Sequence, residues 1–202
     1  MRNLVILLLT VIFVSQNTIA QQSYNDCPNA LEVCPNSVFS ASNIDANVTF
    51  CPGCEDDFNF CFATDNTIWF TFVTNSTGGD VQVDFTSLVF EINPGQDNEL
   101  QATIIQALNP CDANSYSQLG NCVSNATVGF SLNALSLAAN TTYYIVVDGD
   151  NNGAGITSPA ECSFEISISG TGIDRPTPGI AIAPNSTSIC ENEVAVFTAT
   201  LQ

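Results

Sequence analysis

The stretch TIWFTFVT, residues 67–74, decides the fold class of this chain. An extended strand built from it is aromatic or β-branched on both faces, which predicts a central strand buried on both sides. Two other segments alternate apolar and polar residues instead, DVQVDFT at 80–86 and CSFEISIS at 162–169. A period of two indicates strands with one face in a core and the other in water.

Further strands are predicted at residues 100–108, 127–132 and 141–147, with short ones near 37–40 and 47–50. Turn residues separate them, and residues 133–140 are interpreted as a loop. No segment shows an apolar stripe at the helical period of 3.6 with caps. The pattern predicts an all-β chain folded as an antiparallel β-sandwich, jelly-roll or immunoglobulin-like, followed by part of a second β domain.

Residues 1–20 have the three parts of a secretory signal peptide. Arg2 supplies the positive charge, residues 4–14 (LVILLLTVIFV) are apolar, and residues 18–20 (TIA) suit a cleavage site. A membrane anchor is the alternative, but eleven helical residues rise only about 16 Å, roughly half the hydrocarbon core. We therefore expect a secreted protein, extracellular or at the cell surface, that is not inserted in a membrane after cleavage.

Nine cysteines in an exported chain predict a framework of disulfides. They are Cys27, Cys34, Cys51, Cys54, Cys61, Cys111, Cys122, Cys162 and Cys190. The order alone leaves the connectivity open, and the preferred pair is Cys111 with Cys122, because a loop of ten residues between two strands is easily closed. A zinc or redox role for the Cys51–Cys54 motif is disfavoured: no second pair has matching spacing, and the three acidic residues that follow would raise a thiol pKa.

A change of composition after residue 170 predicts a domain boundary. Residues 21–170 form the first domain, 171–179 are a linker rich in Gly and Pro, and 180–202 begin a second β domain that is truncated. The alternative for 180–202 is a disordered tail, which its apolar, β-branched segment VAVFTATL disfavours.

The charge balance excludes several classes of function. The chain has 20 Asp and Glu, 2 Lys and Arg, and no His, for a formal net charge of −18. Nucleic-acid binding rests on Lys and Arg contacts to phosphate, so no nucleic-acid partner is expected. A catalytic triad with His, an imidazole zinc ligand and a Schiff-base lysine are excluded by composition.

Four motifs resemble the pre-peptidase C-terminal type of β-sandwich found in secreted bacterial proteins. They are NDCPNA at 25–30, TIWFTF at 67–72, TGGDVQV at 77–83 and TYYIVVDG at 142–149, the last followed by Gly153 and Gly155. The hairpin between Cys111 and Cys122 is also similar to a cysteine pair of that family. The resemblance covers residues 25–169 and implies a non-catalytic module that binds or spaces.

Residues 184–200 resemble the start of an immunoglobulin-like or PKD-like repeat of bacterial surface proteins. Together the two resemblances are typical of large proteins with many modules, exported by the type IX route. They imply a role in adhesion at the cell surface and further domains in the same polypeptide.

The best candidate for a bound cofactor is calcium, at the segment DGDNNG, residues 148–153. Asp148, Asp150 and Asn152 match positions 1, 3 and 5 of a calcium loop, and Gly153 permits its sharp turn. The twelfth position is Pro159 instead of Glu and no helices flank the segment, so an ordinary turn after the strand is the favoured alternative. Glu161 is a further ligand if the loop folds back.

Two other groups of residues are weighed against simpler explanations. Glu55, Asp56, Asp57 and Asp65 suit a divalent cation, but a solvated acidic loop held by Cys54 and Cys61 is favoured. Trp69, Tyr143 and Tyr144 could stack on sugars, but core packing is favoured in such apolar strands.

The predicted function is that of a secreted, non-catalytic β-sandwich module of a longer bacterial surface protein, acting in adhesion, binding or spacing. The alternative is an accessory ligand- or carbohydrate-binding domain of a secreted hydrolase. The expected partner is an extracellular protein or glycan.

Overall fold

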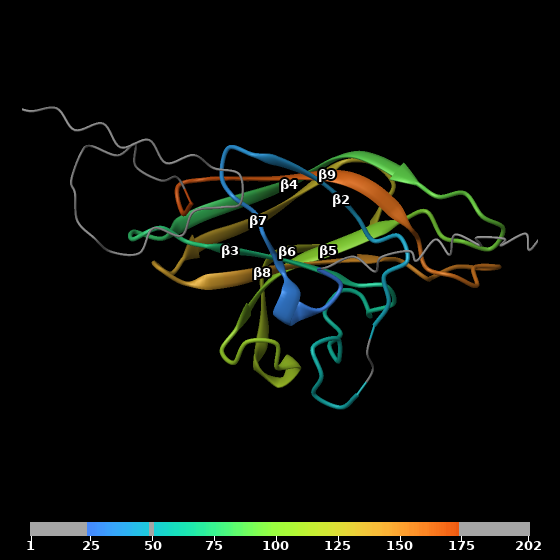
Figure 1. Cartoon of the computed structure of the whole chain (residues 1–202), viewed down its shortest axis with the longest axis horizontal. Coiled ribbons are helices and arrows are strands. Elements are labelled where there is room, and N and C mark those ends of the chain that lie inside the picture. The colour runs from blue at the N-terminus through green and yellow to red at the C-terminus, as the bar shows by residue number, and fades with distance from the viewer. Residues whose placement is uncertain (1–23, 49–50, 174–202) are drawn as a thin grey trace, which may run out of the picture.

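The computed structural model describes residues 24–48 and 51–173, which form two stacked β-sheets (Figure 1). The predicted signal peptide, the predicted linker from residue 174 onward, the second domain and Cys190 lie outside the described residues. Within the described residues, no helix is long and apolar enough to cross a membrane.

One sheet has five strands in the order β1-β3-β8-β5-β6, and the other has four in the order β2-β9-β4-β7. Every pairing is antiparallel except β1 with β3. The prediction of an antiparallel β-sandwich is confirmed. The strands are β1 (Leu31–Glu32), β2 (Val38–Ser42), β3 (Ile68–Val73), β4 (Gly79–Phe90), β5 (Leu100–Ala107), β6 (Tyr116–Ala126), β7 (Phe130–Leu137), β8 (Thr142–Gly149) and β9 (Cys162–Ser169), with two 3-10 turns, η1 (Cys27–Asn29) and η2 (Ala113–Ser115).

The side chains of the two facing sheet surfaces form the main core. Phe70 of β3 meets Phe164 of β9 edge to face at 6.3 Å, and Phe85 of β4 stacks on Phe130 of β7 at 4.5 Å. Along β4 the alternating residues Val81, Val83 and Phe85 are buried, as the sequence pattern predicts. Burial of such side chains contributes about 25 cal/mol per Å² of apolar surface removed from water.

Strand β3 is buried on both faces, as its sequence predicts. Ile68, Phe70 and Phe72 belong to the main core, and Trp69 belongs to a second, smaller cluster on the opposite face. There Trp69 meets Phe58, Tyr116 and Tyr144 with ring centroids 5.9–6.2 Å apart. Core packing of Trp69, Tyr143 and Tyr144 follows from exposures of 0%, 2% and 9%.

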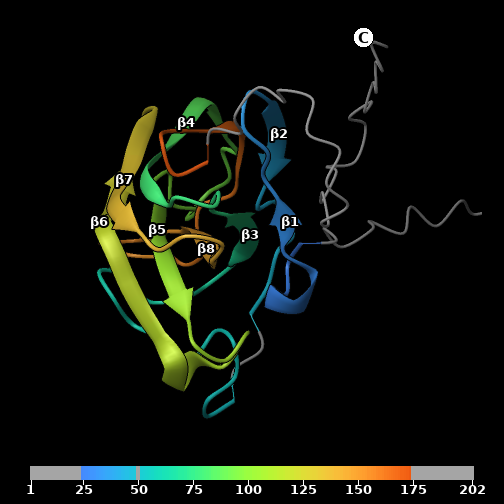
Figure 2. The same cartoon turned by 90° about the vertical axis from the view of Figure 1, so that its left-hand side faces the viewer.

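Strand β6 differs from the sequence prediction, which placed no strand at 116–126 and put one at 127–132, across the turn before β7. Its burial pattern has no buried residue, because β6 is the edge of its sheet. Two register shifts interrupt its pairing with β5. Gly120 has a φ of +69° and lies against the backbone of Asn133, so β6 comes close to β7 at one side of the sandwich (Figure 2). Because β6 is rich in polar residues and is interrupted by bulges, its sequence lacks the alternation of apolar and polar residues that would have predicted a strand.

The predicted loop at 133–140 is also wrong for its first part, because β7 extends to Leu137. The short strand predicted near 37–40 is β2. Residues 47 and 48 form no strand, and residues 49–50 lie outside the described range.

The disulfides differ from the preferred pairing. Cys111 bonds Cys27, Cys122 bonds Cys61, and Cys51 bonds Cys54. The pair Cys111 with Cys122 is wrong because Cys111 lies in the loop after β5, whereas Cys122 lies well along β6, opposite Thr103.

The two other cysteines of the described residues differ from each other. Cys34 is also disulfide-bonded. Cys162 is a free thiol with no exposed surface, so its place among the predicted disulfide cysteines is wrong. Its neighbours on β9 explain this, because Cys162 points into the apolar core together with Phe164 and Ile166.

Candidate functional site

Asp148, the first residue of the predicted calcium loop, is a buried structural carboxylate with no exposed surface. Its Oδ1 accepts hydrogen bonds from the backbone N–H groups of Asp65 and Asn66 and from the Thr67 hydroxyl, each at 2.9 Å. Its Oδ2 accepts a hydrogen bond from Nε2 of Gln101 at 3.0 Å. Asp148 therefore ties the entry of β3 to β8 and β5 and does not point into the loop that follows.

Burial raises the pKa of Asp148 to about 7, although its four hydrogen bonds lower it. Desolvation disfavours the charged form of a carboxyl group, whereas donors directed at it favour that form. The folded protein therefore holds a proton on this group more tightly than the unfolded chain does.

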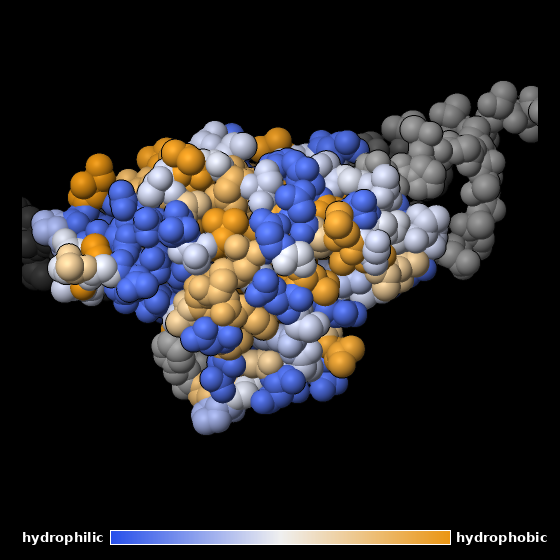
Figure 3. Space-filling model, turned by 180° about the vertical axis from the view of Figure 1, so that it is seen from behind, coloured by the Kyte–Doolittle hydropathy of each residue, from blue (hydrophilic) through white to orange (hydrophobic). Residues whose placement is uncertain are grey.

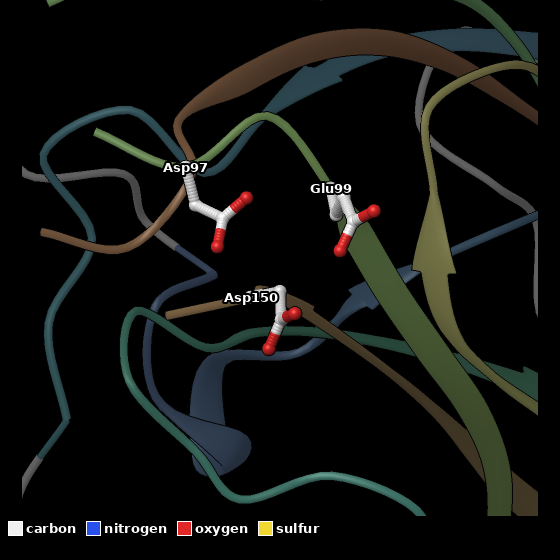
Figure 4. A group of neighbouring side chains, drawn as sticks. All are labelled: Asp97, Glu99 and Asp150. Carbon is white, nitrogen blue, oxygen red and sulfur yellow. The ribbon is translucent and has the colours of Figure 1, made fainter. Parts of the chain in front are cut away.

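Three other carboxylates converge at the same end of the sandwich (Figure 4). Oxygens of Asp97, Glu99 and Asp150 all lie within 4.8 Å of one another. Asp97 and Glu99 come from the segment before β5, and Asp150 directly follows β8. A backbone hydrogen bond from Asp150 N–H to the Glu99 carbonyl at 2.8 Å holds the two segments together.

The pKa of Asp150 is raised, first by burial and then by the charges of Asp97 and Glu99. Asn152 takes part through its backbone, whose N–H donates to Oδ2 of Asp97 at 3.1 Å. Of the three predicted ligands, only Asp150 thus offers its side chain to this group. Asp97, Glu99 and Asp150 are the residues that could hold a cation here, since carboxylate oxygens are preferred ligands of Ca²⁺.

A polar cleft of about 490 Å³ lies beside these carboxylates. One wall is the loop 59–65, the other is formed by residues 150–152, and Glu99, Gln101 and Ser124 lie between them. Asn151 bridges the two walls, because its Nδ2 donates to Oδ1 of Asp65 at 3.2 Å. Hydrophilic residues also gather at this end of the molecule in the space-filling view (Figure 3).

The loop 59–65 owes its position to two constraints. The Cys61–Cys122 disulfide fixes it to β6, and the Asp148 carboxylate binds the backbone N–H of Asp65. Loops placed by a rigid sheet are where binding residues are commonly found.

The carboxylates of the second predicted acidic group, residues 55–57 and Asp65, do not converge on one site in the structure. Asp56 is buried and accepts a hydrogen bond from the Trp69 indole N–H at 3.3 Å, whereas Asp57 accepts one from the Gly53 N–H at 2.8 Å. Burial raises the pKa of Glu55. Asp65 alone of the four lines the cleft.

Glu161, the further ligand weighed from the sequence, is engaged elsewhere. Its two carboxylate oxygens accept hydrogen bonds from the Asp45 N–H at 3.0 Å and from the Gln96 side chain at 2.8 Å. It is therefore not among the carboxylates that converge near Asp150.

No family model matches this chain, and no curated protein matches it either. Among solved structures, the chain is similar to the pre-peptidase C-terminal domain of a collagenase from Bacillus anthracis, with 15% identity and a TM-score of 0.32. The match covers 69% of this chain and 94% of that chain. A TM-score this low carries no argument, so the fold assignment rests on the two sheets themselves.

Proposed function

We propose that this chain is a non-catalytic binding module of a larger extracellular protein, and that the end of the sandwich with the cleft is its binding end. The signal peptide pattern and the disulfides support an extracellular location, because disulfides persist in oxidising compartments. The motifs that resemble pre-peptidase C-terminal domains support a module within a longer polypeptide.

The cleft is the observation on which the binding role depends. It is concave, polar and bordered by loops that a disulfide and a buried carboxylate hold in place. Concave sites with a few fixed polar groups are typical of ligand binding. A spacer would need no such feature. Several amide side chains at the cleft, including Asn59, Asn125 and Asn151, also suit a hydroxyl-rich ligand, which favours the carbohydrate-binding alternative.

Binding to a panel of immobilised neutral glycans, acidic glycans, basic peptides and acidic peptides tests this proposal on the full chain. We expect one ligand class to retain the protein and the double variant D65N/E99Q to lose that retention. The double variant D45N/E91Q makes the same charge change at exposed positions outside the cleft and should be retained. If no ligand class retains either the wild type or D45N/E91Q, the binding role is contradicted and a role as a spacer is favoured.

Calcium is the second part of the proposal. We place it at Asp97, Glu99 and Asp150 instead of at Asp148, Asp150 and Asn152, because the Asp148 side chain is committed to its four donors. Burial and then the charges of Asp97 and Glu99 raise the pKa of Asp150, and a divalent cation would offset those charges.

Millimolar CaCl2 is therefore expected to raise the melting temperature of the full chain by about 3 °C or more, since a ligand of the folded state stabilises it. NaCl of matched ionic strength should raise it less, because salt only screens the net negative charge. E99Q should lose the calcium-specific rise, and E91Q should keep it. Equal shifts with the two salts in a thermal melt would contradict the calcium site.

A further inference from the structure

We propose that the open edge of β2 is the docking site for residues 194–201 of this same chain, and that a disulfide between Cys34 and Cys190 holds them there. The site lies on the side of the sandwich where β1 and β2 are found, opposite β6 and β7 (Figure 2). It shares no residue with the cleft, so it is a second surface, separate from the proposed binding end.

The covalent tether follows from the pairing of the cysteines. Cys34 is disulfide-bonded. Of the other cysteines in the described residues, six pair among themselves and Cys162 is a free thiol. Among the nine cysteines of the chain, Cys190 is then the one left to bond Cys34. The two thiols give up two protons and two electrons, which a disulfide of an oxidising compartment accepts as it is reduced to two thiols.

The described chain ends at the same end of the sandwich as Cys34. The N–H of Val33 donates to the Thr71 carbonyl at 2.8 Å, close to the end of β3. Just beyond that end, the N–H of Asn75 donates to the Gly172 carbonyl at 2.7 Å. The segment that follows residue 173 therefore starts near Cys34.

The connection from there to Cys190 is long enough. It consists of residues 174–189, and sixteen extended residues span up to about 50 Å. Neighbouring strands of a sheet lie only about 4.8 Å apart. A tether also raises the effective concentration of the segment at the edge of β2, so docking within the chain is favoured over docking between molecules.

The backbone of β2 offers hydrogen-bonding groups on its outer side. The N–H of Asn43 donates to the Cys162 carbonyl at 3.2 Å, which continues the pairing with β9. Successive N–H groups of a strand point to opposite sides, so the N–H groups of Ser40 and Ser42 point away from β9. That of Ser42 donates to the Tyr24 hydroxyl at 3.2 Å, and Ser40 is exposed. An edge of this kind is a template for a further strand.

Composition favours residues 194–201 as the occupant. Strand β2 has the sequence VFSAS, with none of the charges or prolines that commonly protect an edge, and its Val38 is 65% exposed. The segment VAVFTATL is also uncharged and is rich in residues that favour strands. A second copy of the chain would bring a formal net charge of −18 to the same edge, so repulsion disfavours it.

Peptide mapping of the full chain without reduction tests the tether. Digestion with pepsin at low pH, where thiols exchange slowly, is expected to release linked peptides that contain Cys34 and Cys190. After denaturation the wild type should show one free thiol, that of Cys162, and C190S should show two. C162A is the matched control and should show none while keeping the linked peptides.

Hydrogen exchange followed by NMR tests the docking. We expect the Ser40 amide to exchange at least about tenfold more slowly in the wild type than in V196P, because proline inside the docked strand removes a ladder hydrogen bond while the disulfide stays. T187P places the same residue outside the docked strand and should keep the slow exchange.

Each contrary outcome overturns the proposal in a different way. A bond from Cys34 to any other cysteine, or a free thiol at Cys190, would remove the tether. Linked peptides with equal Ser40 exchange in the wild type and V196P would remove the docked strand. Slow exchange that depends on protein concentration and survives V196P would identify a second copy as the occupant. Retention by glycans or peptides at the cleft is measured separately, so failure here leaves the proposed function untouched.

Discussion

Replacement of Asp148 by alanine is expected to lower the free energy of unfolding by about 4 kcal/mol. The change leaves the backbone N–H groups of Asp65 and Asn66 and the Thr67 hydroxyl without their acceptor in a buried position. An orphaned buried donor costs about 1–3 kcal/mol. Chemical denaturation of the full chain measures the loss.

D148N is the matched control for this change. The asparagine oxygen keeps an acceptor for the three donors from residues 65–67, and its amide can donate to Gln101 Oε1 once the Gln101 amide rotates. We expect D148N to cost less than half of what D148A costs. A loss below about 1 kcal/mol for D148A would contradict the structural role of this carboxylate.

The pH dependence of stability follows from the same group. Its pKa rises from 3.8 to about 7 on folding, so between these values the folded state binds more protons than the unfolded state. Stability contributed by this group is therefore present at low pH and is lost as pH rises through about 7. We expect the wild type to be more stable at pH 5 than at pH 8, and D148N to show a shallower slope. Identical slopes would contradict the raised pKa.

Removal of the Cys61–Cys122 disulfide by the double variant C61S/C122S is expected to destabilise the protein by about 4 kcal/mol. The bond joins residues with a sequence separation of 61. Without it the unfolded chain gains conformational entropy, which lowers the free energy of unfolding. Its removal also releases loop 59–65, which forms one wall of the cleft. The binding that we propose for the cleft should therefore weaken under conditions in which the variant is still folded.

The double variant C51S/C54S is the control for that experiment. Its disulfide spans a sequence separation of only 3, and the same loop-entropy relation predicts a loss of about 1–2 kcal/mol. Denaturation of both variants, side by side with the wild type, measures the difference. Equal losses for the two variants would mean that Cys61–Cys122 does not hold the long loop in place.

The fold class could be predicted because the order of apolar and polar residues in β3 and β9 indicates which faces of these strands are buried. Residues 67–74 are apolar on both faces, and β3 is buried on both faces. Residues 162–169 alternate, and β9 has one buried face. Strand β6 could not be predicted, because an edge strand with bulges has no periodic apolar face.

The candidate site could be predicted only in part. The segment predicted as a calcium loop contains Asp150, which lies beside Asp97 and Glu99 in the structure. Those two residues are about fifty positions earlier in the sequence and reach Asp150 only through the pairing of β5 with β8. A weak signal existed, since QDNEL at 96–100 places two carboxylates directly before a strand. Nothing in the sequence around Asp148 indicates that its carboxylate is buried, because the four hydrogen-bond donors that surround it come from residues 65–67 and from Gln101.

The disulfide pairing failed for a related reason. A short sequence separation favours a disulfide because the loop it closes is small. The arrangement of the strands and loops in the fold, however, determines which cysteines lie next to each other. Cys27 and Cys111 are 84 residues apart and still meet, with Cα atoms 5.6 Å apart.

The intact mass of the native extracellular polypeptide, captured with an antibody against residues 24–173, tests the central claim most directly. A module of a larger protein predicts a species far heavier than the 21.4 kDa of these 202 residues. A native species at or below that mass would contradict the claim that this sandwich serves a larger protein.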